Sequence, residues 1–264
     1  MSMTSHQQRL VTAGVLIALL AGLIFAAPLA VQAAAVALVC ACALVEFWAM
    51  FWSGRIWLKG LGLILAVPLV LAPLLEWNVL GWLLACFWLC GAGYAFWGRS
   101  HKDMVWSDAA LVICGLIYIP CSLQFALYLS QWELFLILGA VFVSDTGAFY
   151  AGSKWGKRKL CPGISPQKTW EGSVCGLAAC IIFCLGLGLF WAPGQWQVWI
   201  GIGAALNVAA QLGDLFESAL KRELGVKDSG GILPGHGGVL DRVDSLLLSV
   251  PVYMAIRSVF PLLG

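Results

Sequence analysis

The stretch GSVCGLAACIIFCLGLGLFWAPGQWQVWIGIGAALNVAAQLGD, residues 172–214, contains no charged side chain before its last residue, Asp214. It consists mainly of two apolar runs, 172–192 and 196–216, which are joined by a short connection containing Pro and Gly. Each run has about the 20 apolar residues that a helix needs to cross a bilayer. The pair therefore predicts two membrane-spanning helices joined by a tight turn on one membrane face.

The composition of the whole chain indicates the same environment. Of its 264 residues, 61% are hydrophobic and 11% are charged, and the mean hydropathy is +0.92. Because soluble domains have about 25% charged residues, this composition is that of an integral membrane protein. Nine of the ten cysteines lie inside apolar runs without zinc-ligand spacing, and they are interpreted as small packing residues. The sequence therefore predicts an all-α polytopic membrane protein.

Several further apolar runs are candidates for membrane helices. The full set lies at residues 10–27, 33–52, 60–75, 79–97, 106–129, 132–152, 172–192, 196–216 and 244–261. Arg9 precedes the first run, but no cleavage site leading into a soluble mature chain follows it, so it is interpreted as a span. We therefore expect about nine transmembrane helices.

The basic residues predict the orientation of these helices, because Lys and Arg accumulate in cytoplasmic loops. If the N-terminus lies in the cytoplasm and the nine runs alternate, 14 of the 15 Lys and Arg residues fall on the cytoplasmic side. The exception is Arg257, which lies inside the last run. We therefore expect a cytoplasmic N-terminus.

The acidic residues divide the chain into two regions, since eight of the 13 Asp and Glu residues lie from Asp145 onward. We expect residues 1–105 to form a scaffold of transmembrane helices. Residues 106–264 are expected to form the catalytic transmembrane region, with cytoplasmic loops at 153–171 and 217–243.

Two polar segments at the first of these loops suggest a phosphate site. In SDTGAFYAGSKWGKRKL (144–160), Asp145 lies about two turns inside a span, where an ionisable residue indicates function by default. The basic residues that follow it are also explained by orientation and by attraction to anionic lipids. In PGISPQKTWEGS (162–173), Lys168 and Thr169 precede a helix N-terminus, which suits phosphate. Thr169 is explained equally well as a simple helix cap.

The third polar segment, GDLFESALKRELGVKDSGGILPGHGGVLDRVDS (213–245), combines carboxylates with a glycine-rich loop. Asp241 and Asp244 share one face at a helix entrance, and Asp228 approaches from the loop. Such carboxylates fit a hard cation, of which Mg²⁺ is the expected one, held together with substrate phosphates. Acidic residues at a helix entrance also complement the helix dipole without binding a ligand. His236 is a candidate proton donor or phosphate contact.

The predicted topology brings these segments together. The loops at 153–171 and 217–243 are separated by two spans, so they emerge on the same membrane face. Asp145 and Asp214 would lie slightly below that face. This position suits a reaction between a soluble phosphate compound and a lipid. Familiar alternatives do not fit, because GSKWGKR (152–158) lacks the spacing of a P-loop and HGG has no accompanying G-x-S-x-G.

From Ser218 to Asp244 the chain fills every fixed position of the pattern S-x-hydrophobic-K-R-x4-K-D-x-small-x2-hydrophobic-P-x-H-G-G-hydrophobic-x-D-R-x-D. This pattern is the signature of the phosphatidate cytidylyltransferases, or CDP-diacylglycerol synthases, which the chain therefore resembles. SPQKTWEG and SDTGAFYAGSKWGK are also similar to that family, and the resemblance is strongest over 144–245.

The resemblance implies a transfer from CTP to phosphatidate that yields CDP-diacylglycerol and pyrophosphate, as a step of phospholipid biosynthesis. It implies that Asp228, Asp241 and Asp244 hold a divalent metal, expected to be Mg²⁺. It implies that Lys221, Arg222, Lys227 and Arg242 neutralise the triphosphate and the lipid phosphate. The expected catalytic residues are the three aspartates with Lys221, Arg222 and His236. The resemblance assigns phosphate contacts to Ser165, Lys168 and Thr169, and binding of a second cation or orientation of basic residues to Asp145, Glu171 and Asp214.

The expected partners are CTP, phosphatidate and membrane lipids, with no nucleic acid, and the family association adds a homodimer. The family and the size of the chain suggest a bacterial inner membrane, with the site facing the cytoplasm. One alternative is a CTP-dependent transferase acting on another lipid phosphate, such as a polyprenyl phosphate. Another is an ion-coupled transporter, although transporter sites lie near the midplane between internal repeats, and no repeat is visible here.

Overall fold

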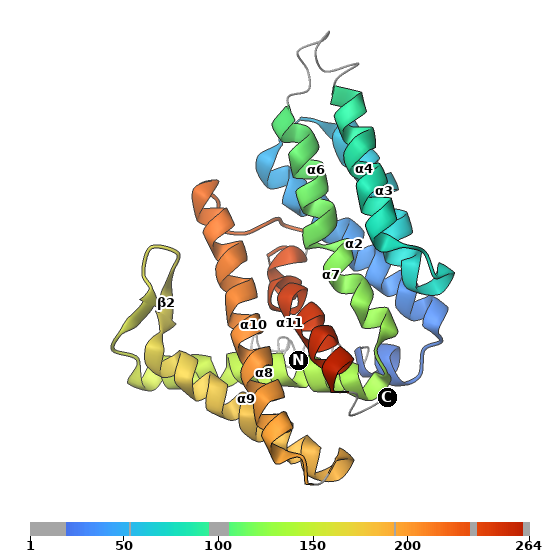
Figure 1. The fold of residues 1–264 in the computed structure, drawn as a ribbon. Helices are drawn as coiled ribbons and strands as arrows, with labels where there is room; N and C mark the ends of the chain where they lie inside the picture. Colours follow the sequence, from blue (N-terminus) through green and yellow to red (C-terminus); the bar gives the residue numbers. More distant parts are fainter. Residues whose placement is uncertain (1–19, 53, 95–105, 193, 233–236, 261–264) are drawn as a thin grey trace, which may run out of the picture.

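The computed structural model describes residues 20–52, 54–94, 106–192, 194–232 and 237–260 (Figure 1). Its helices are α2 (Leu29–Phe51), α3 (Ile56–Leu75), α4 (Val79–Gly93), α6 (Trp106–Tyr118), α7 (Pro120–Leu123), the 3₁₀ helix η2 (Gln124–Tyr128), α8 (Gln131–Trp155), α9 (Trp170–Trp191), α10 (Trp196–Glu223) and α11 (Leu240–Val259). One small antiparallel hairpin, β1 (Lys159–Cys161) and β2 (Ser165–Thr169), lies between α8 and α9. The prediction of an all-α protein is confirmed, with this hairpin as an addition.

Six helical segments of the described chain are long and apolar enough to cross a membrane. They are α2, α3, the continuous stretch 106–128, α8, α9 and α10. The predicted runs at 79–97 and 244–261 are also helical, as α4 and α11. The run at 10–27 and its flanking Arg9 lie largely outside the described residues. The total of nine spans and the cytoplasmic N-terminus remain predictions.

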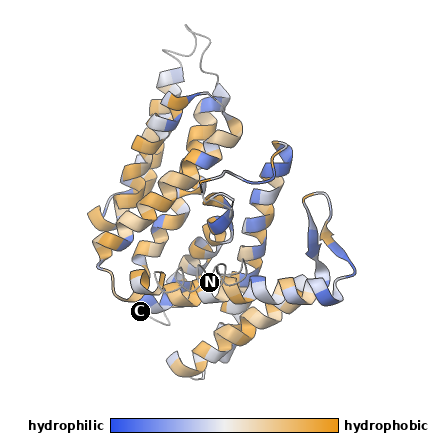
Figure 2. Ribbon diagram, turned by 180° about the vertical axis from the view of Figure 1, so that it is seen from behind, coloured by the Kyte–Doolittle hydropathy of each residue, from blue (hydrophilic) through white to orange (hydrophobic). Residues whose placement is uncertain are grey.

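The surface of these helices is apolar, as a lipid-facing surface must be. Trp88 is 71% exposed and Phe190 is 85% exposed. Figure 2 shows hydrophobic residues along most of the helices, whereas hydrophilic residues gather at the hairpin and at the C-terminal end of α10. The protein is therefore an integral membrane protein, and its hydrophilic residues are concentrated at the hairpin and at the C-terminal end of α10.

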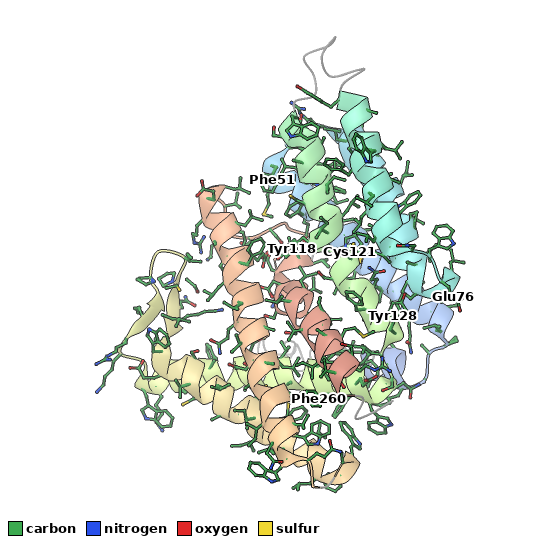
Figure 3. All side chains as sticks on the ribbon, viewed as in Figure 1. Phe51, Glu76, Tyr118, Cys121, Tyr128 and Phe260 are labelled. Carbon is green, nitrogen blue, oxygen red and sulfur yellow. The ribbon has the colours of Figure 1, made fainter. Side chains whose placement is uncertain are left out.

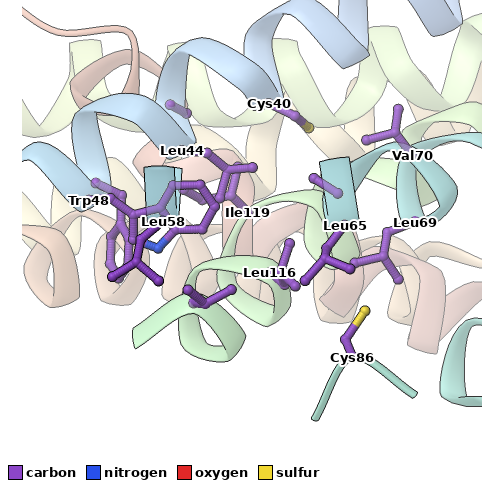
Figure 4. Close-up of a cluster of buried hydrophobic side chains, with 14 of the residues drawn as sticks. Cys40, Leu44, Trp48, Leu58, Leu65, Leu69, Val70, Cys86, Leu116 and Ile119 are labelled. Carbon is purple, nitrogen blue, oxygen red and sulfur yellow. The ribbon is translucent and has the colours of Figure 1, made fainter. Parts of the chain in front are cut away.

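The first buried core lies among α2, α3, α4 and α6 (Figure 4). Trp48 is completely buried there, and its Nε1 donates a hydrogen bond to the carbonyl oxygen of Leu111 at 3.1 Å. Cys40 and Cys86 belong to the same core, which confirms their interpretation as packing residues. Leu240 of α11 also belongs to it, so the last helix packs into the N-terminal core.

The second buried core lies among α8, α9, α10 and α11. Leu136, Cys180 and Leu206 are fully buried in it, and α11 contributes Val250 and Tyr253. Helix α11 is therefore shared by both cores, and Figure 1 shows it between α10 and α7. This shared helix joins the two halves of the chain.

A buried ion pair fixes the C-terminal end of α11 to the start of α8. Glu133 is completely buried, and its carboxylate lies 3.0 Å from Arg257 Nε and accepts a hydrogen bond from the Tyr253 hydroxyl at 3.2 Å. Arg257 also donates to the carbonyl oxygen of Tyr128 at 2.7 Å. The basic residue that the orientation pattern left unexplained is therefore the partner of a buried acid.

We expect the substitution Arg257→Ala to destabilise the protein, because it leaves the Glu133 carboxylate buried without its cation. Breaking a buried pair in this way costs about 3 to 5 kcal/mol. The variant should therefore melt well below the unsubstituted protein when unfolding is followed in detergent. Arg257→Lys, which keeps the charge, should lose less, and equal melting temperatures for all three proteins would contradict the assignment.

Candidate active site

The hairpin is fixed to the entrance of α9 by two residues that the sequence singled out. Thr169 caps α9, because its hydroxyl accepts a hydrogen bond from the Gly172 N–H at 3.2 Å. The Glu171 carboxylate accepts from the backbone N–H groups of Lys157 at 3.1 Å and of Arg158 at 3.2 Å. Glu171 therefore holds the turn between α8 and β1, and Thr169 caps α9, within the segment 153–171 that was predicted as a cytoplasmic loop.

A cavity of about 670 Å³, lined by charged and polar side chains together with apolar ones, lies between α8, the hairpin, α9 and α10. Five of the predicted site residues line it: Asp145, Ser165, Lys168, Thr169 and Asp214. The ammonium of Lys168 lies 2.6 Å from Asp214 Oδ2, so this ion pair joins β2 to α10. The cavity therefore presents a cation, hydroxyl groups and carboxylates from segments that are far apart in the sequence.

A chain of polar side chains continues from this cavity between α8, α9 and α10. The Ser173 hydroxyl donates to Gln211 Oε1 at 2.5 Å, and Gln211 Nε2 donates to Asn207 Oδ1 at 2.8 Å. Asn207 Nδ2 then donates to the Ser144 hydroxyl at 2.6 Å. Gln211 and Asn207 were not predicted as site residues, although their spacing places them on the same helix face as Asp214.

A second charged cluster joins the end of α10 to the start of α11. Lys221 Nζ lies 2.6 Å from Asp241 Oδ1 and 3.4 Å from Glu217 Oε2. Asp241 also accepts hydrogen bonds from the backbone N–H groups of Ser229 at 3.1 Å and of Gly238 at 2.8 Å. Asp241 therefore holds both ends of the glycine-rich loop as well as the Lys221 ammonium.

Helix α10 continues to Glu223, past the predicted end of its span at residue 216. Its last turn closes at Gly225, which has a positive φ of 68° and is followed by a Val226 N–H bonded to the Lys221 carbonyl oxygen at 2.9 Å. The basic pair Lys221 and Arg222 lies in this turn, where cations complement the helix dipole. The loop after α10 is therefore shorter than the predicted loop at 217–243.

Two buried groups beside this cluster were not identified from the sequence. Glu217 is completely buried, and its ion-pair partner is the Lys221 ammonium, 3.4 Å from its Oε2. The Tyr118 hydroxyl is buried without a hydrogen bond to the described residues, and it lies within electrostatic reach of Glu217, Asp244 and Asp214. Figure 3 shows Tyr118 at the junction of α6 and α10, where its ring packs on Phe216 with centroids 5.2 Å apart.

The two clusters meet because α10 and α11 approach very closely at Gly213. A Cβ atom at this position would lie 2.5 Å from the carbonyl oxygen of Asp244. The absence of a side chain at Gly213 therefore allows Asp214 and Asp244 to lie near each other. Asp145 is within electrostatic reach of both.

The remaining predicted residues lie around the cluster. Arg222 donates to the carbonyl oxygens of Ile164 at 3.2 Å and Val226 at 3.1 Å, so it joins the hairpin turn to the end of α10. The side chains of Lys227, Asp228 and Arg242 are exposed. His236 lies outside the described residues.

Within the described part of the chain, no three His, Cys, Asp or Glu side chains converge in the way that a protein-only metal site requires. The assignment of Asp228, Asp241 and Asp244 as ligands therefore stays a prediction.

These features define a polytopic helical membrane protein with a polar site suited to phosphate groups between its lipid-exposed helices. The chain belongs to the cytidylyltransferase family, whose sequence pattern matches residues 7–260. The family expected from the signature is thereby confirmed.

Individual relatives agree with this assignment. The chain is 42% identical over 158 residues to a phosphatidate cytidylyltransferase of Staphylococcus aureus, which covers 58% of this chain and 60% of that protein. It is 40% identical over 149 residues to a phosphatidate cytidylyltransferase of Pseudomonas aeruginosa, covering 54% of this chain and 55% of that protein. The protein of the same name from Rickettsia bellii is 32% identical over 218 residues, covering 78% of this chain and 84% of the relative. The match thus spans about 60% of the length of the Staphylococcus relative and most of the Rickettsia one.

We expect Gly213→Ala to destabilise the protein by separating α10 from α11. Alanine favours a helix over glycine by about 1 kcal/mol, whereas overpacking a tight contact costs about 1 to 3 kcal/mol. Because the atom that the new methyl group would meet is backbone, the cost should outweigh the gain, and the melting temperature in detergent should fall.

Gly201→Ala is the matched control, since a Cβ atom at Gly201 of the same helix would meet nothing within 4 Å. This variant should melt at or slightly above the temperature of the unsubstituted protein. If both variants were equally stable, the close contact at Gly213 would not be a constraint.

Proposed function

We propose that this protein transfers the cytidylyl group of CTP to the phosphate of phosphatidate in phospholipid biosynthesis. In this reaction a phosphate oxygen of the lipid attacks the α-phosphorus of CTP. A new P–O bond forms, the bond from the α-phosphorus to the bridging oxygen of the β-phosphate breaks, and pyrophosphate leaves. The proposal rests above all on the cavity that brings Lys168, Asp145 and Asp214 together among lipid-exposed helices.

The position of the cavity suits a lipid substrate. Its walls include α8, α9 and α10, whose surfaces bear exposed apolar residues such as Ile182 and Phe216, and Phe149 is exposed while it also lines the cavity. A phosphatidate molecule can therefore keep its acyl chains in the bilayer while its phosphate enters the polar space. The volume of about 670 Å³ falls within the range of small-molecule sites, which is roughly 300 to 1,000 Å³.

The basic residues are proposed to neutralise the phosphates of both substrates. Lys168 and Lys221 are each held by a carboxylate, Asp214 and Asp241, at 2.6 Å. Such pairing orients each ammonium before a substrate arrives, and preorganised charge is an efficient way to stabilise a transition state. Arg222, Lys227 and Arg242 are proposed to add positive charge at the nucleotide, and His236 to act as a proton donor or phosphate contact.

The carboxylates of this region suit a hard cation such as Mg²⁺. Glu217 is completely buried, with the Lys221 ammonium 3.4 Å from its Oε2, and it lies beside Asp244 and Asp241. Neighbouring buried carboxylates repel each other, and a cation would offset this repulsion. Asp228, Asp241 and Asp244 are the proposed ligands, with Glu217 as an additional oxygen donor. When bound, the cation would neutralise charge on the nucleotide phosphates.

The cellular setting is also part of the proposal. We place the protein in a bacterial inner membrane, with the cavity facing the cytoplasm, where CTP is available. The distribution of basic residues supports this orientation. A homodimer is proposed from the family association.

Detergent-solubilised protein should convert labelled CTP and phosphatidate to CDP-diacylglycerol with Mg²⁺ and should lose this activity with a chelator. A parallel reaction with a polyprenyl phosphate in place of phosphatidate tests the other lipid acceptor. A folded sample that forms no product from phosphatidate would contradict the proposal, and product from the polyprenyl phosphate alone would assign that acceptor. Substrate-gradient uptake into liposomes without product would instead indicate a transporter.

We expect Asp244→Asn to lower kcat by at least about a hundredfold, the effect typical of a lost charge-stabilising group. The variant should keep the expression level and melting temperature of the unsubstituted protein within a few degrees. Glu76→Gln is the matched control, because Glu76 is exposed and ends α3 at the far end of the N-terminal core. Near-normal turnover by Asp244→Asn would show that this carboxylate has no part in the reaction.

A further inference from the structure

Glu46 is a buried acid of α2 that reaches the signature loop from the N-terminal part of the chain. It is 2% exposed and lies in the region that was expected to act only as a scaffold. Its Oε2 accepts a hydrogen bond from the Leu240 N–H at 2.9 Å and another from the Ser229 hydroxyl at 3.3 Å. The same carboxylate therefore caps the start of α11 and holds the loop that precedes it.

Two glycines of the loop lie directly against this carboxylate. A Cβ atom at Gly230 would be 2.5 Å from Glu46 Oε1 and 2.6 Å from its Cγ. A Cβ atom at Gly238 would be 2.6 Å from Glu46 Oε2. The absence of side chains at Gly230 and Gly238 lets the backbone at these two positions pack directly against the Glu46 carboxylate.

The other side of the same loop holds Asp241. Ser229 donates its backbone N–H to Asp241 and its hydroxyl to Glu46. Gly238, which packs on Glu46, donates its N–H to Asp241 at 2.8 Å. Ser229 and Gly238 therefore each contact two carboxylates, that of Glu46 from α2 and that of Asp241 from α11. Asp241 also forms the ion pair with Lys221 at 2.6 Å.

Packing alone does not account for an acid at this position. Glu46 Oε1 is buried without a hydrogen bond from the described residues. A buried polar atom without a partner costs stability, and an apolar side chain of similar size would avoid that cost. The compensating effect of Glu46 is the order that it imposes on the loop and on the first turn of α11.

We propose that Glu46 is a positioning residue of the active site, which sets the geometry of Asp241 and Lys221 through Ser229, Gly238 and Leu240. This inference rests on the proposed cytidylyl transfer, since Asp241 and Lys221 are assigned to that reaction. It makes α2 a part of the site, and not only a support for it.

The activity test is a double-substitution cycle. Gly230→Ala should lower kcat by about tenfold or more, since small displacements of catalytic groups cost up to about a hundredfold. Glu46→Ala should have an effect of similar size. In the Glu46→Ala background, Gly230→Ala should cost almost nothing further, because the three atoms nearest to its methyl group all belong to the Glu46 side chain. An equal cost of Gly230→Ala in both backgrounds would overturn the inference.

A second measurement is independent of turnover. Hydrogen exchange of peptides that cover residues 226–242 should be faster in Glu46→Ala than in the unsubstituted protein, whereas α8 and α9 should be unchanged. Glu133→Gln is the matched control, because it removes another fully buried carboxylate, at the far end of α11, and should leave the loop unchanged. Unchanged exchange of the loop in Glu46→Ala would also overturn the inference.

The two measurements separate the inference from the proposed function. If the unsubstituted protein makes no CDP-diacylglycerol, the proposed function fails, and loop exchange still tests the role of Glu46. If Glu46→Ala does not fold, Glu46→Gln keeps the side-chain volume and one acceptor, and it should show the same two changes at smaller size. A Glu46→Gln variant with unaltered exchange and unaltered kcat would then contradict the inference.

Discussion

The ion pair between Lys221 and Asp241 is the contact on which the site depends. It joins the last turn of α10 to the first turn of α11, and Asp241 also receives the N–H groups of Ser229 and Gly238. An ion removed from water is stable only when other groups compensate its charge, and here the compensation comes from both helices and from the loop between them. Loss of this ion pair would therefore leave the remaining charged side chain without its partner, and it would also weaken the hold of Asp241 on the loop.

Helix α11 links the Lys221–Asp241 ion pair to the rest of the protein, because its residues pack in both buried cores. Leu240 packs into the core of α2, α3, α4 and α6, whereas Val250 and Tyr253 pack into that of α8, α9 and α10. The position of its first turn is set by Glu46, and that of its last turns by Glu133 and Arg257. The site is consequently assembled between the two halves of the chain.

The cavity shows how a membrane helix bundle can accommodate charge. Lys168 and Asp214 form an ion pair at the wall of the cavity, so their charges offset each other. Next to the cavity, the polar side chains of Ser173, Gln211 and Asn207 form hydrogen bonds with one another. Apolar residues of the same helices face outward. This division suits a reaction in which a lipid remains in the bilayer while its phosphate meets a nucleotide.

The sequence by itself determined the class of fold, because apolar runs of membrane length require helices, and it determined the family through the spacing from Ser218 to Asp244. It also singled out Asp145, Lys168 and Asp214, which line one cavity in the structure. Only the tertiary structure revealed Glu46, Tyr118 and Glu217, since a single polar residue in an apolar run has no local pattern that indicates its partner. The hairpin and the true end of α10 were likewise decided by contacts between distant segments, such as Arg222 with Ile164. Local spacing specifies which residues share a helix face, whereas packing between helices decides which faces meet.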